Sequence, residues 1–433
     1  MTDTSTTTDL QTSGFGPAPV VQPRAPRSVL VAATVSLVAL TLSFTAVTAE
    51  TDVAGASAAS LMSAILVGLA ALGMFRVFLF AMLLRPLRDV GLAVAAAAPL
   101  IVSLALAAGR LEVSYAAFAA AESVACVLLV VVARRADIRA VASAALALLV
   151  GLSLIAAALL PSLVIAGRDF LPLLYDGRVG GLMGHPNGMG LISGLLVLAS
   201  MSRRGLTRVL LVGLGALGLA ASASQTSTIA TVAALLVMEL AALWLRTRTV
   251  SGRLALVAVF LVVGAGLLFA LTYTDVTTAL TSGDTVDTSF SGRTGIWASL
   301  LDNGAVPALG LGHADTAQLI SSLTRVGSTH NVWIDAYLVD GLIGMLALGI
   351  SAVAFVVAAG REFRAGSAVG VGIVTSFAIV GLTESGPTHP AFFLLFVCAA
   401  LGLSGLTTPA EVLDSRAPSG LPAPTIQTGR VHR

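Results

Sequence analysis

Two histidines in polar turns are the residues best suited to chemistry in an otherwise apolar chain. His185 lies in Gly184-His185-Pro186-Asn187-Gly188, and His330 lies in Thr329-His330-Asn331. An imidazole ring accepts a proton near neutral pH, so a histidine held in place can act as a general base. Each also has a plainer interpretation. His330 could be a solvated loop side chain, and the first motif could be turn and cap chemistry, because proline suits a first helical position.

A third segment combines a cation with an aromatic residue. Ser291-Gly292-Arg293-Thr294-Gly295-Ile296-Trp297 begins like a helix that Asn303-Gly304 would end. Arg293 and Trp297 then share one helix face. We expect a short interfacial helix, with Trp297 in the headgroup layer and Arg293 beside an anion site. A lone interfacial anchor is the alternative.

Three other polar residues are candidate contacts for a substrate. Arg178 precedes the first histidine motif and is our preferred second contact, after Arg293, for a phosphate group. Glu384 opens the turn Glu384-Ser385-Gly386-Pro387-Thr388-His389. For that turn, simple turn chemistry is again the alternative. Gln225 lies close to the outer end of an apolar segment. No spacing of cysteine or histidine predicts a metal site.

The elements that must position these residues are membrane helices. Of the 433 residues 57% are hydrophobic and only 11% are charged, so lipid must be the solvent for most of the chain. Apolar blocks of about 20 residues match the length of a membrane-crossing helix. The sequence therefore predicts an all-α integral membrane protein with about 12 spans, at residues 28–49, 58–84, 90–108, 113–133, 140–163, 188–202, 207–222, 226–245, 254–272, 332–358, 366–384 and 389–406.

The arginines predict how these spans are oriented. All 24 basic residues are arginine, and basic loops stay in the cytoplasm. With the amino terminus inside, 18 arginines fall in cytoplasmic segments, five fall outside and Arg76 lies within the membrane. Both termini are therefore expected in the cytoplasm. The near-zero net charge gives no indication of nucleic-acid binding.

This topology divides the chain into five parts. Residues 1–27 and 407–433 are expected to be disordered cytoplasmic tails. Residues 28–272 hold the first nine spans, including an external loop at 164–187, and residues 332–406 hold the last three. The long external loop 273–331, with its interfacial helix, lies between spans nine and ten. It is too small for an enzyme domain and is expected to cap a site at the outer helix ends.

Two charged residues are expected inside the membrane. Arg76 and Glu122 fall at comparable depths of the second and fourth spans. An unpaired charge there costs about 2.5–3.5 kcal/mol even on insertion scales, so both should face protein. We expect a structural ion pair, with a substrate path as the alternative.

Taken together, the motifs resemble the O-antigen ligase and polymerase family of bacterial membrane glycosyltransferases. The resemblance covers about residues 180–405 and lies in Gly184-His185-Pro186-Asn187, in Ser291-Gly292-Arg293 with Trp297, in Thr329-His330-Asn331 with Leu338, Gly341, Leu342, Ile343 and Gly344, and in Leu382-Thr383-Glu384-Ser385. It implies a GT-C-like fold and transfer of a glycan from undecaprenyl diphosphate to an acceptor saccharide. The reaction would occur at the outer face of the bacterial cytoplasmic membrane, without metal or cofactor.

The resemblance also implies roles for single residues. Arg293 would bind the donor diphosphate, and His330 would activate the acceptor hydroxyl, with inversion at the anomeric carbon. Substrate-binding residues are then expected to be Arg178, His185, Asn187, Gln225, Trp297, Asn331 and Glu384. One position departs from the family, whose members commonly carry arginine or lysine where this chain has Gln225, or Ser227 if the alignment slips by two.

Two other classes of function remain open. Twelve helices are familiar in transporters and flippases, although the sequence lacks the matching interrupted helices of inverted-repeat carriers. A non-catalytic membrane partner of a polysaccharide assembly complex is the other alternative. If loss of Arg293 or His330 left function intact, the interpretation as a non-catalytic partner would gain support.

Overall fold

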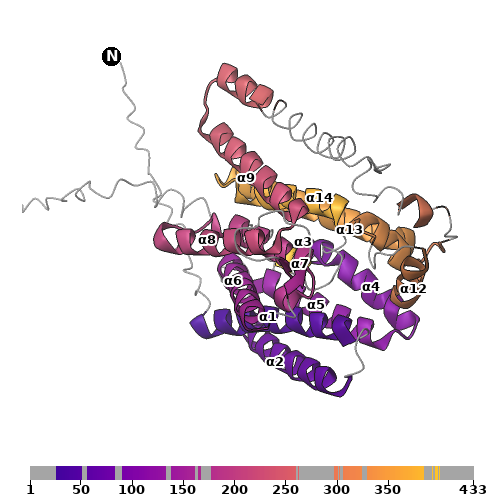
Figure 1. The fold of residues 1–433 in the computed structure, drawn as a ribbon. Helices are drawn as coiled ribbons and strands as arrows, with labels where there is room; N and C mark the ends of the chain where they lie inside the picture. The colour runs from indigo at the N-terminus through magenta and orange to yellow at the C-terminus, as the bar shows by residue number, and fades with distance from the viewer. Residues whose placement is uncertain are drawn as a thin grey trace, which may run out of the picture.

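The protein is a bundle of apolar helices, shown in Figure 1. The structure is a computed structural model and describes residues 26–50, 56–82, 90–132, 138–160, 164–166, 177–259, 262, 297–300, 302, 306–323, 329–384, 393, 395–397 and 399. The helices of its first half are α1 (Arg27–Glu50), α2 (Ala56–Met82), α3 (Val90–Ala96), α4 (Ala98–Gly109), α5 (Val113–Val132) and α6 (Ile138–Leu159). Those of its second half are α7 (Pro186–Ser200), α8 (Gly205–Ser222), α9 (Gln225–Arg246), α12 (His313–Leu323), α13 (Val332–Arg364) and α14 (Val369–Thr383).

The helices are those of a multi-pass membrane protein. Within the described residues, four helices are long and apolar enough to span a membrane, namely α6, α8, α9 and α13, and shorter apolar helices accompany them. The described helices that correspond to expected spans begin within four residues of them. One expected span, 90–108, is instead two helices, α3 and α4. They are divided at Ala97, where Pro99 lies in the first turn of α4 and cannot continue a preceding helix. The total of 12 spans stays a prediction.

Helix α7 lies at the centre of the bundle. Almost all of its residues are buried, and it packs against α6, α8, α9 and α14. Two glycines permit this close packing, because a Cβ at Gly190 would meet Ser224 and a Cβ at Gly194 would meet Thr231, both near the start of α9. Small residues are the usual means by which membrane helices approach one another. The packing brings the first turns of α7 and α9 together.

A short β-ribbon lies beside this central helix. Strand β1 (Val164–Ala166) pairs antiparallel with β2 (Gly177–Val179), placing Ile165 opposite Arg178. The 3₁₀ helix η2 (Gly181–Met183) then leads directly into α7. Arg178 is thereby held on a paired strand beside the amino-terminal end of α7.

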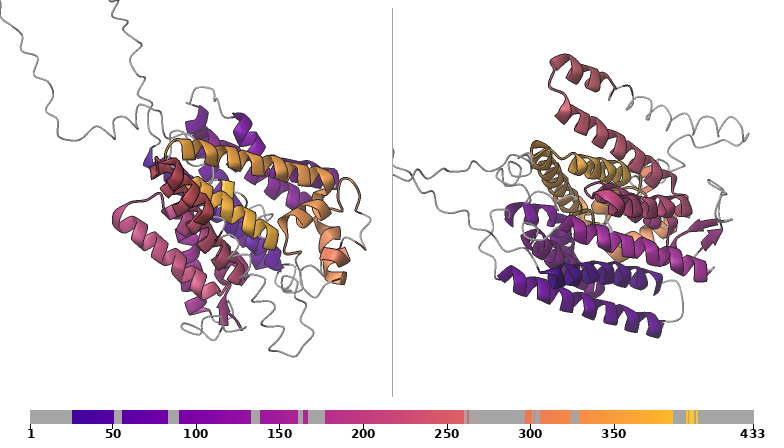
Figure 2. Two further views of the ribbon diagram at one scale, coloured as in Figure 1. Left: turned by 90° about the horizontal axis from the view of Figure 1, so that it is seen from above. Right: turned by 90° about the vertical axis from the view of Figure 1, so that its left-hand side faces the viewer.

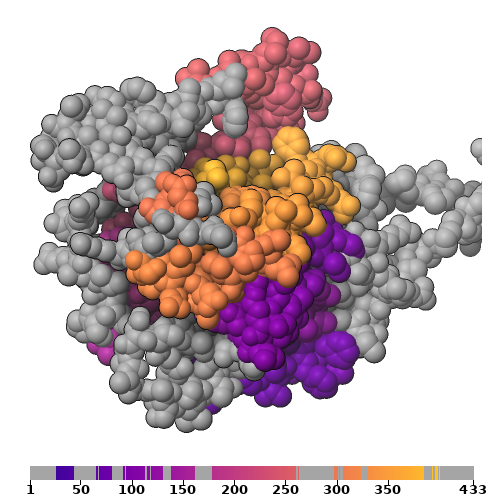
Figure 3. All heavy atoms as spheres, turned by 90° about the vertical axis from the view of Figure 1, so that its right-hand side faces the viewer, coloured from indigo at the N-terminus to yellow at the C-terminus, as the bar shows by residue number. Residues whose placement is uncertain are grey.

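Helix α13 contains a break that a preceding loop stabilises. Gly341 has φ 68° and ψ −156°, which opens the helical hydrogen-bond ladder. The loop before α12 replaces the missing bonds: Leu311 N donates to Leu338 O at 2.7 Å, and Leu342 N donates to Ala308 O at 3.0 Å. The guanidinium of Arg110 also donates to Val339 O at 3.2 Å. Figure 3 shows the resulting seam, with α12 and α13 in orange against α3 to α5 in purple.

A buried ion pair holds the other end of α13. Arg139 on α6 donates to both carboxylate oxygens of Glu362 at 3.1 and 3.0 Å and also to Ala399 O. Ser367 donates to the same carboxylate, and both charged side chains are almost fully buried. The expected span 140–163 leaves Arg139 just outside the helix, whereas it is the second residue of α6 and its side chain is buried.

The expected ion pair between Arg76 and Glu122 is also wrong. The side chain of Arg76 is exposed on α2. Glu122 is fully buried on α5, and neither of its carboxylate oxygens has a hydrogen-bond partner in the part of the chain that the structure describes. Comparable depth along two helices therefore does not bring the two charges together.

Candidate active site

His330 is held in a tight turn between Thr329 and α13. Its φ of 53° lies in the left-handed region that few non-glycine residues adopt. The flanking contacts impose this conformation. The side chain of Asn331 caps α13 by accepting from Trp333 N at 2.9 Å and Ile334 N at 3.2 Å, and the indole N–H of Trp297 donates to Thr329 O at 2.8 Å.

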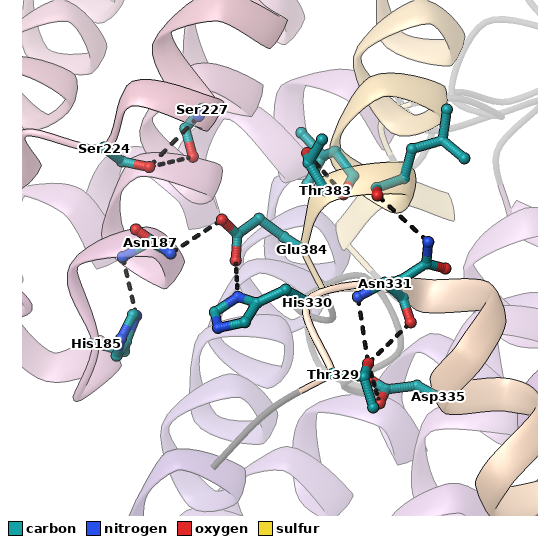
Figure 4. Close-up of polar contacts among 12 residues, drawn as sticks. His185, Asn187, Ser224, Ser227, Thr329, His330, Asn331, Asp335, Thr383 and Glu384 are labelled. Carbon is teal, nitrogen blue, oxygen red and sulfur yellow. Dashed lines mark hydrogen bonds and ion pairs between the residues drawn. The ribbon is translucent and has the colours of Figure 1, made fainter. Parts of the chain in front are cut away.

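The ring of His330 faces a carboxylate from the end of α14. Its Nδ1 lies 3.1 Å from Oε2 of Glu384 (Figure 4), and the two side chains are only 15% and 8% exposed. Asn331 Nδ2 donates to Leu382 O at 3.3 Å, which ties the same turn to the end of α14 a second time. A histidine and a carboxylate that are 54 residues apart in the sequence are thus neighbours.

The hydrogen bonds continue from Glu384 to Asn187 and Arg178. Asn187 Nδ2 donates to Glu384 Oε1 at 3.0 Å, and Arg178 Nη2 donates to Asn187 Oδ1 at 2.8 Å. Arg178 Nε also donates to the carbonyl of Ser222, at the end of α8, at 3.2 Å. The chain of contacts therefore joins β2, α7, the end of α8, the end of α14 and the turn before α13.

The arginine gives this chain of hydrogen bonds its direction. A guanidinium can only donate, so the oxygen of the Asn187 amide must face Arg178 and its nitrogen must face Glu384. Glu384 accepts at both oxygens, and the ionised carboxylate requires Nδ1 of His330 to carry the ring proton. In the neutral ring, Nε2 is then the nitrogen that can accept a proton.

His185 caps α7 next to this chain of contacts. Its Nδ1 accepts from Asn187 N at 3.1 Å, which requires that nitrogen to be unprotonated. His185 is exposed at its surface, and partial burial of its ring lowers its pKa below the ordinary 6.5. Arg178 and His330 lower it further, while Glu384 acts in the opposite direction. Burial also lowers the pKa of Arg178, again opposed by Glu384, but a guanidinium stays charged.

The remaining predicted site residues occupy different positions. Gln225 is the exposed first residue of α9 and lies three positions after Ser222, whose carbonyl binds Arg178. Trp297 is partly buried beneath the turn of His330 and supports that turn, and its expected place in the headgroup layer stays a prediction. Arg293 lies outside the described residues.

Sequence reasoning missed two supports of the site. Thr329 donates to Asp335 at 2.6 Å across the first turn of α13, and the carbonyl of Ser222 holds Arg178. The first had a local signal, a threonine six residues before an acid at a helix start, whereas a backbone carbonyl leaves no signal in a sequence. No group of three or more metal-binding side chains occurs among the residues described.

The chain was also compared with known proteins. A family model described as O-antigen ligase matches residues 209–349, a stretch that runs from α8 to the middle of α13 and includes Gln225, Trp297, His330 and Asn331. No curated protein matches the chain. The resemblance to the O-antigen ligase and polymerase family is therefore confirmed, and it rests on residues 209–349.

Proposed function

We propose that this protein transfers a glycan from undecaprenyl diphosphate to an acceptor saccharide at the outer face of the bacterial cytoplasmic membrane. The family match supports a glycosyltransferase-like role in polysaccharide biosynthesis. The observation that carries the proposal is the hydrogen-bonded chain from Arg178 through Asn187 and Glu384 to His330. It combines a cation and an oriented histidine, which are the two groups that such a transfer needs.

His330 would act as the general base. Its Nε2 would remove the proton of the acceptor hydroxyl while the hydroxyl oxygen bonds to the anomeric carbon of the donor. Glu384 would hold the ring in the required tautomer and stabilise the imidazolium that forms. Glu384 is therefore a positioning residue in this mechanism rather than a direct substrate contact.

The leaving diphosphate needs positive charge at the opposite side of the anomeric carbon. The bond from that carbon to the phosphate oxygen breaks, and the electron pair leaves with the diphosphate, so the configuration is inverted. Fixed cations stabilise the developing negative charge. Arg178 is only partly buried and has N–H groups beyond those bound to Asn187 and Ser222, so it can bind a phosphate. Arg293 is proposed as the second cation.

Arg178 is positioned to supply the positive charge that the chain lacks near Gln225. Its guanidinium binds the carbonyl of Ser222, the last residue of α8, and the family commonly has a basic residue three positions later, at Gln225, or at Ser227. A cation from β2 thus lies close to the place where the sequence lacks one. We infer that Arg178 replaces that residue.

The test is transfer of a labelled undecaprenyl-diphosphate glycan by purified protein. We expect His330→Ala and Arg293→Ala to abolish transfer while thermal melts remain close to wild type. His313→Ala is the matched control, because this histidine is stacked on Tyr115 at 4.0 Å and belongs to no part of the proposed mechanism. Normal transfer by folded His330→Ala would contradict the proposal, and a wild type inactive with several donors and acceptors would favour a transporter or an accessory protein.

A further inference from the structure

An apolar groove lies between α9, α13, α14 and the helix Val250–Val259. Its volume is about 610 Å³, within the range of small-molecule pockets. Its lining is almost entirely aliphatic and aromatic, and the hydroxyl of Thr375 is already bonded to Val371 O at 2.9 Å. Walls of this kind fit a hydrocarbon chain and offer little to a polar ligand.

The spacing of the lining residues makes the groove run along the helices. On α9 the lining residues follow the spacing i, i+3, i+4, i+7 of one helix face: Val237, Leu240, Ala241 and Trp244. The same spacing recurs on α13 from Val356 to Phe363. At 1.5 Å per residue, each of these two stripes is roughly 10 Å long. Figure 2 shows α9, α13 and α14 running close together, and α14 packs against both of the others.

The groove lies at the end of these helices opposite the candidate active site. α9 begins three residues after Ser222, Asn331 caps the start of α13 and Glu384 caps the end of α14. These three residues belong to the site. The lining residues of α9 are roughly 18–28 Å along that helix from its first residue. The groove therefore opens in the other leaflet of the membrane, which is the cytoplasmic leaflet in the predicted orientation.

Positive charge surrounds this end of the groove. Arg246, Arg253 and Arg364 are exposed and lie within three residues of Trp244, Leu256 and Phe363 of the lining. The guanidinium carbon of Arg253 lies 5.4 Å from the ring centroid of Trp244, so at least one of these cations is at the groove itself.

The neighbouring acidic side chains do not cancel this charge. Glu239, an exposed residue of α9, is on the opposite side of that helix from the lining stripe. Glu362 is already paired with Arg139. Basic sites between membrane helices on the cytoplasmic side are characteristic of binding to anionic lipid headgroups.

We propose that this groove binds an anionic phospholipid of the leaflet opposite the candidate active site. One acyl chain would occupy the channel between α9, α13 and α14, and the headgroup phosphate would lie among Arg246, Arg253 and Arg364. The proposal does not depend on glycan transfer, because it concerns binding alone.

The experiment measures the melting temperature of purified protein in detergent with added phosphatidylglycerol or phosphatidylcholine. We expect phosphatidylglycerol to raise the melting temperature of the wild type by several degrees and phosphatidylcholine to leave it unchanged. The double variant Arg246→Gln/Arg253→Gln should lose the shift, and Ala241→Phe should lose it by filling the groove. Arg204→Gln/Arg208→Gln removes the same charge at the start of α8, away from the lining, and should keep the shift.

Three results would overturn the proposal. The first is an equal shift with phosphatidylcholine. The second is a full shift in folded Arg246→Gln/Arg253→Gln, which answers the question even if Ala241→Phe does not fold. The third is stabilisation by undecaprenyl phosphate with none by phosphatidylglycerol, which would assign the groove to an isoprenoid chain.

Discussion

Replacing Glu384 by glutamine should lower the rate of glycan transfer by about 10²- to 10⁴-fold, the usual contribution of a general base. The reason is the direction of the hydrogen bonds. Arg178 can only donate, so Asn187 presents its N–H to residue 384, and the glutamine must turn its oxygen toward Asn187. Its NH₂ group then faces Nδ1 of His330, where the carboxylate oxygen had been.

This reversed contact changes the tautomer of the histidine. Nδ1 must now accept a hydrogen bond, so the ring proton moves to Nε2, and that nitrogen can no longer take a proton from the acceptor. The fold should change little, because glutamine has the shape of glutamate. A lost bond to a charged group costs about 1.5–3 kcal/mol, which a thermal melt would register as a modest shift.

A second substitution separates this argument from simple damage. In the double variant Asn187→Asp/Glu384→Gln, the carboxylate introduced at position 187 can accept from both Arg178 and the glutamine NH₂, so the glutamine oxygen turns back to Nδ1 of His330. Single-turnover transfer of a labelled donor should then recover at least tenfold over Glu384→Gln alone. Full activity of Glu384→Gln, or no recovery in the folded double variant, would refute the assigned direction.

Two further predictions concern stability, and a third concerns transfer. His185 has a lowered pKa in the fold, so its contribution to stability is present above pH 6.5 and is lost as the pH falls through the lower folded value. His185→Asn keeps a capping side chain and should therefore lose less melting temperature than the wild type between pH 8 and 5. Identical pH profiles of the two proteins would contradict this. Glu362→Gln should lower the free energy of unfolding by about 3–5 kcal/mol, because it removes the carboxylate that neutralises the buried Arg139. Adding Arg139→Met should restore part of the melting temperature, and no recovery in the folded double variant would contradict the buried pair. Trp297→Phe removes the donor to Thr329 O and should lower transfer less than His330→Ala does, whereas an equal loss would make Trp297 part of the reaction itself.

The helices could be predicted because a membrane span is visible in a sequence as a continuous apolar segment. An apolar block of about 20 residues has few alternatives to a helix in lipid, and the corresponding helices accordingly begin within four residues of the expected positions. The break at Ala97 was not predicted, because average hydropathy does not distinguish a proline in the first turn of a new helix from a proline within a longer helix. The break at Gly341 depends on bonds from Ala308 and Leu311, which lie some 30 residues earlier.

The site residues could be recognised individually, but their contacts could not be predicted. His330, Asn187 and Glu384 stood out because each lies in a polar turn at the end of an apolar segment. Their meeting depends on how α7, α13 and α14 pack, and helical periodicity gives the face of a residue without its distance from another helix. Arg139 illustrates the same limit: an arginine at the start of a helix can face water or, as here, a buried Glu362.

The backbone of His330 allows a final test of whether the left-handed turn exists in the folded protein. A non-glycine residue at φ 53° is disfavoured by roughly 1–2 kcal/mol relative to right-handed backbone, a cost that glycine does not have. His330→Gly should therefore melt at a higher temperature than His330→Ala, although both remove the ring and its contact with Glu384. His313 begins α12 and does not have a positive φ, so the same two substitutions there should not favour glycine. If alanine proved the more stable residue at 330, the left-handed turn would not exist in the folded protein, and the direction in which the histidine is presented to an acceptor would have to be derived anew.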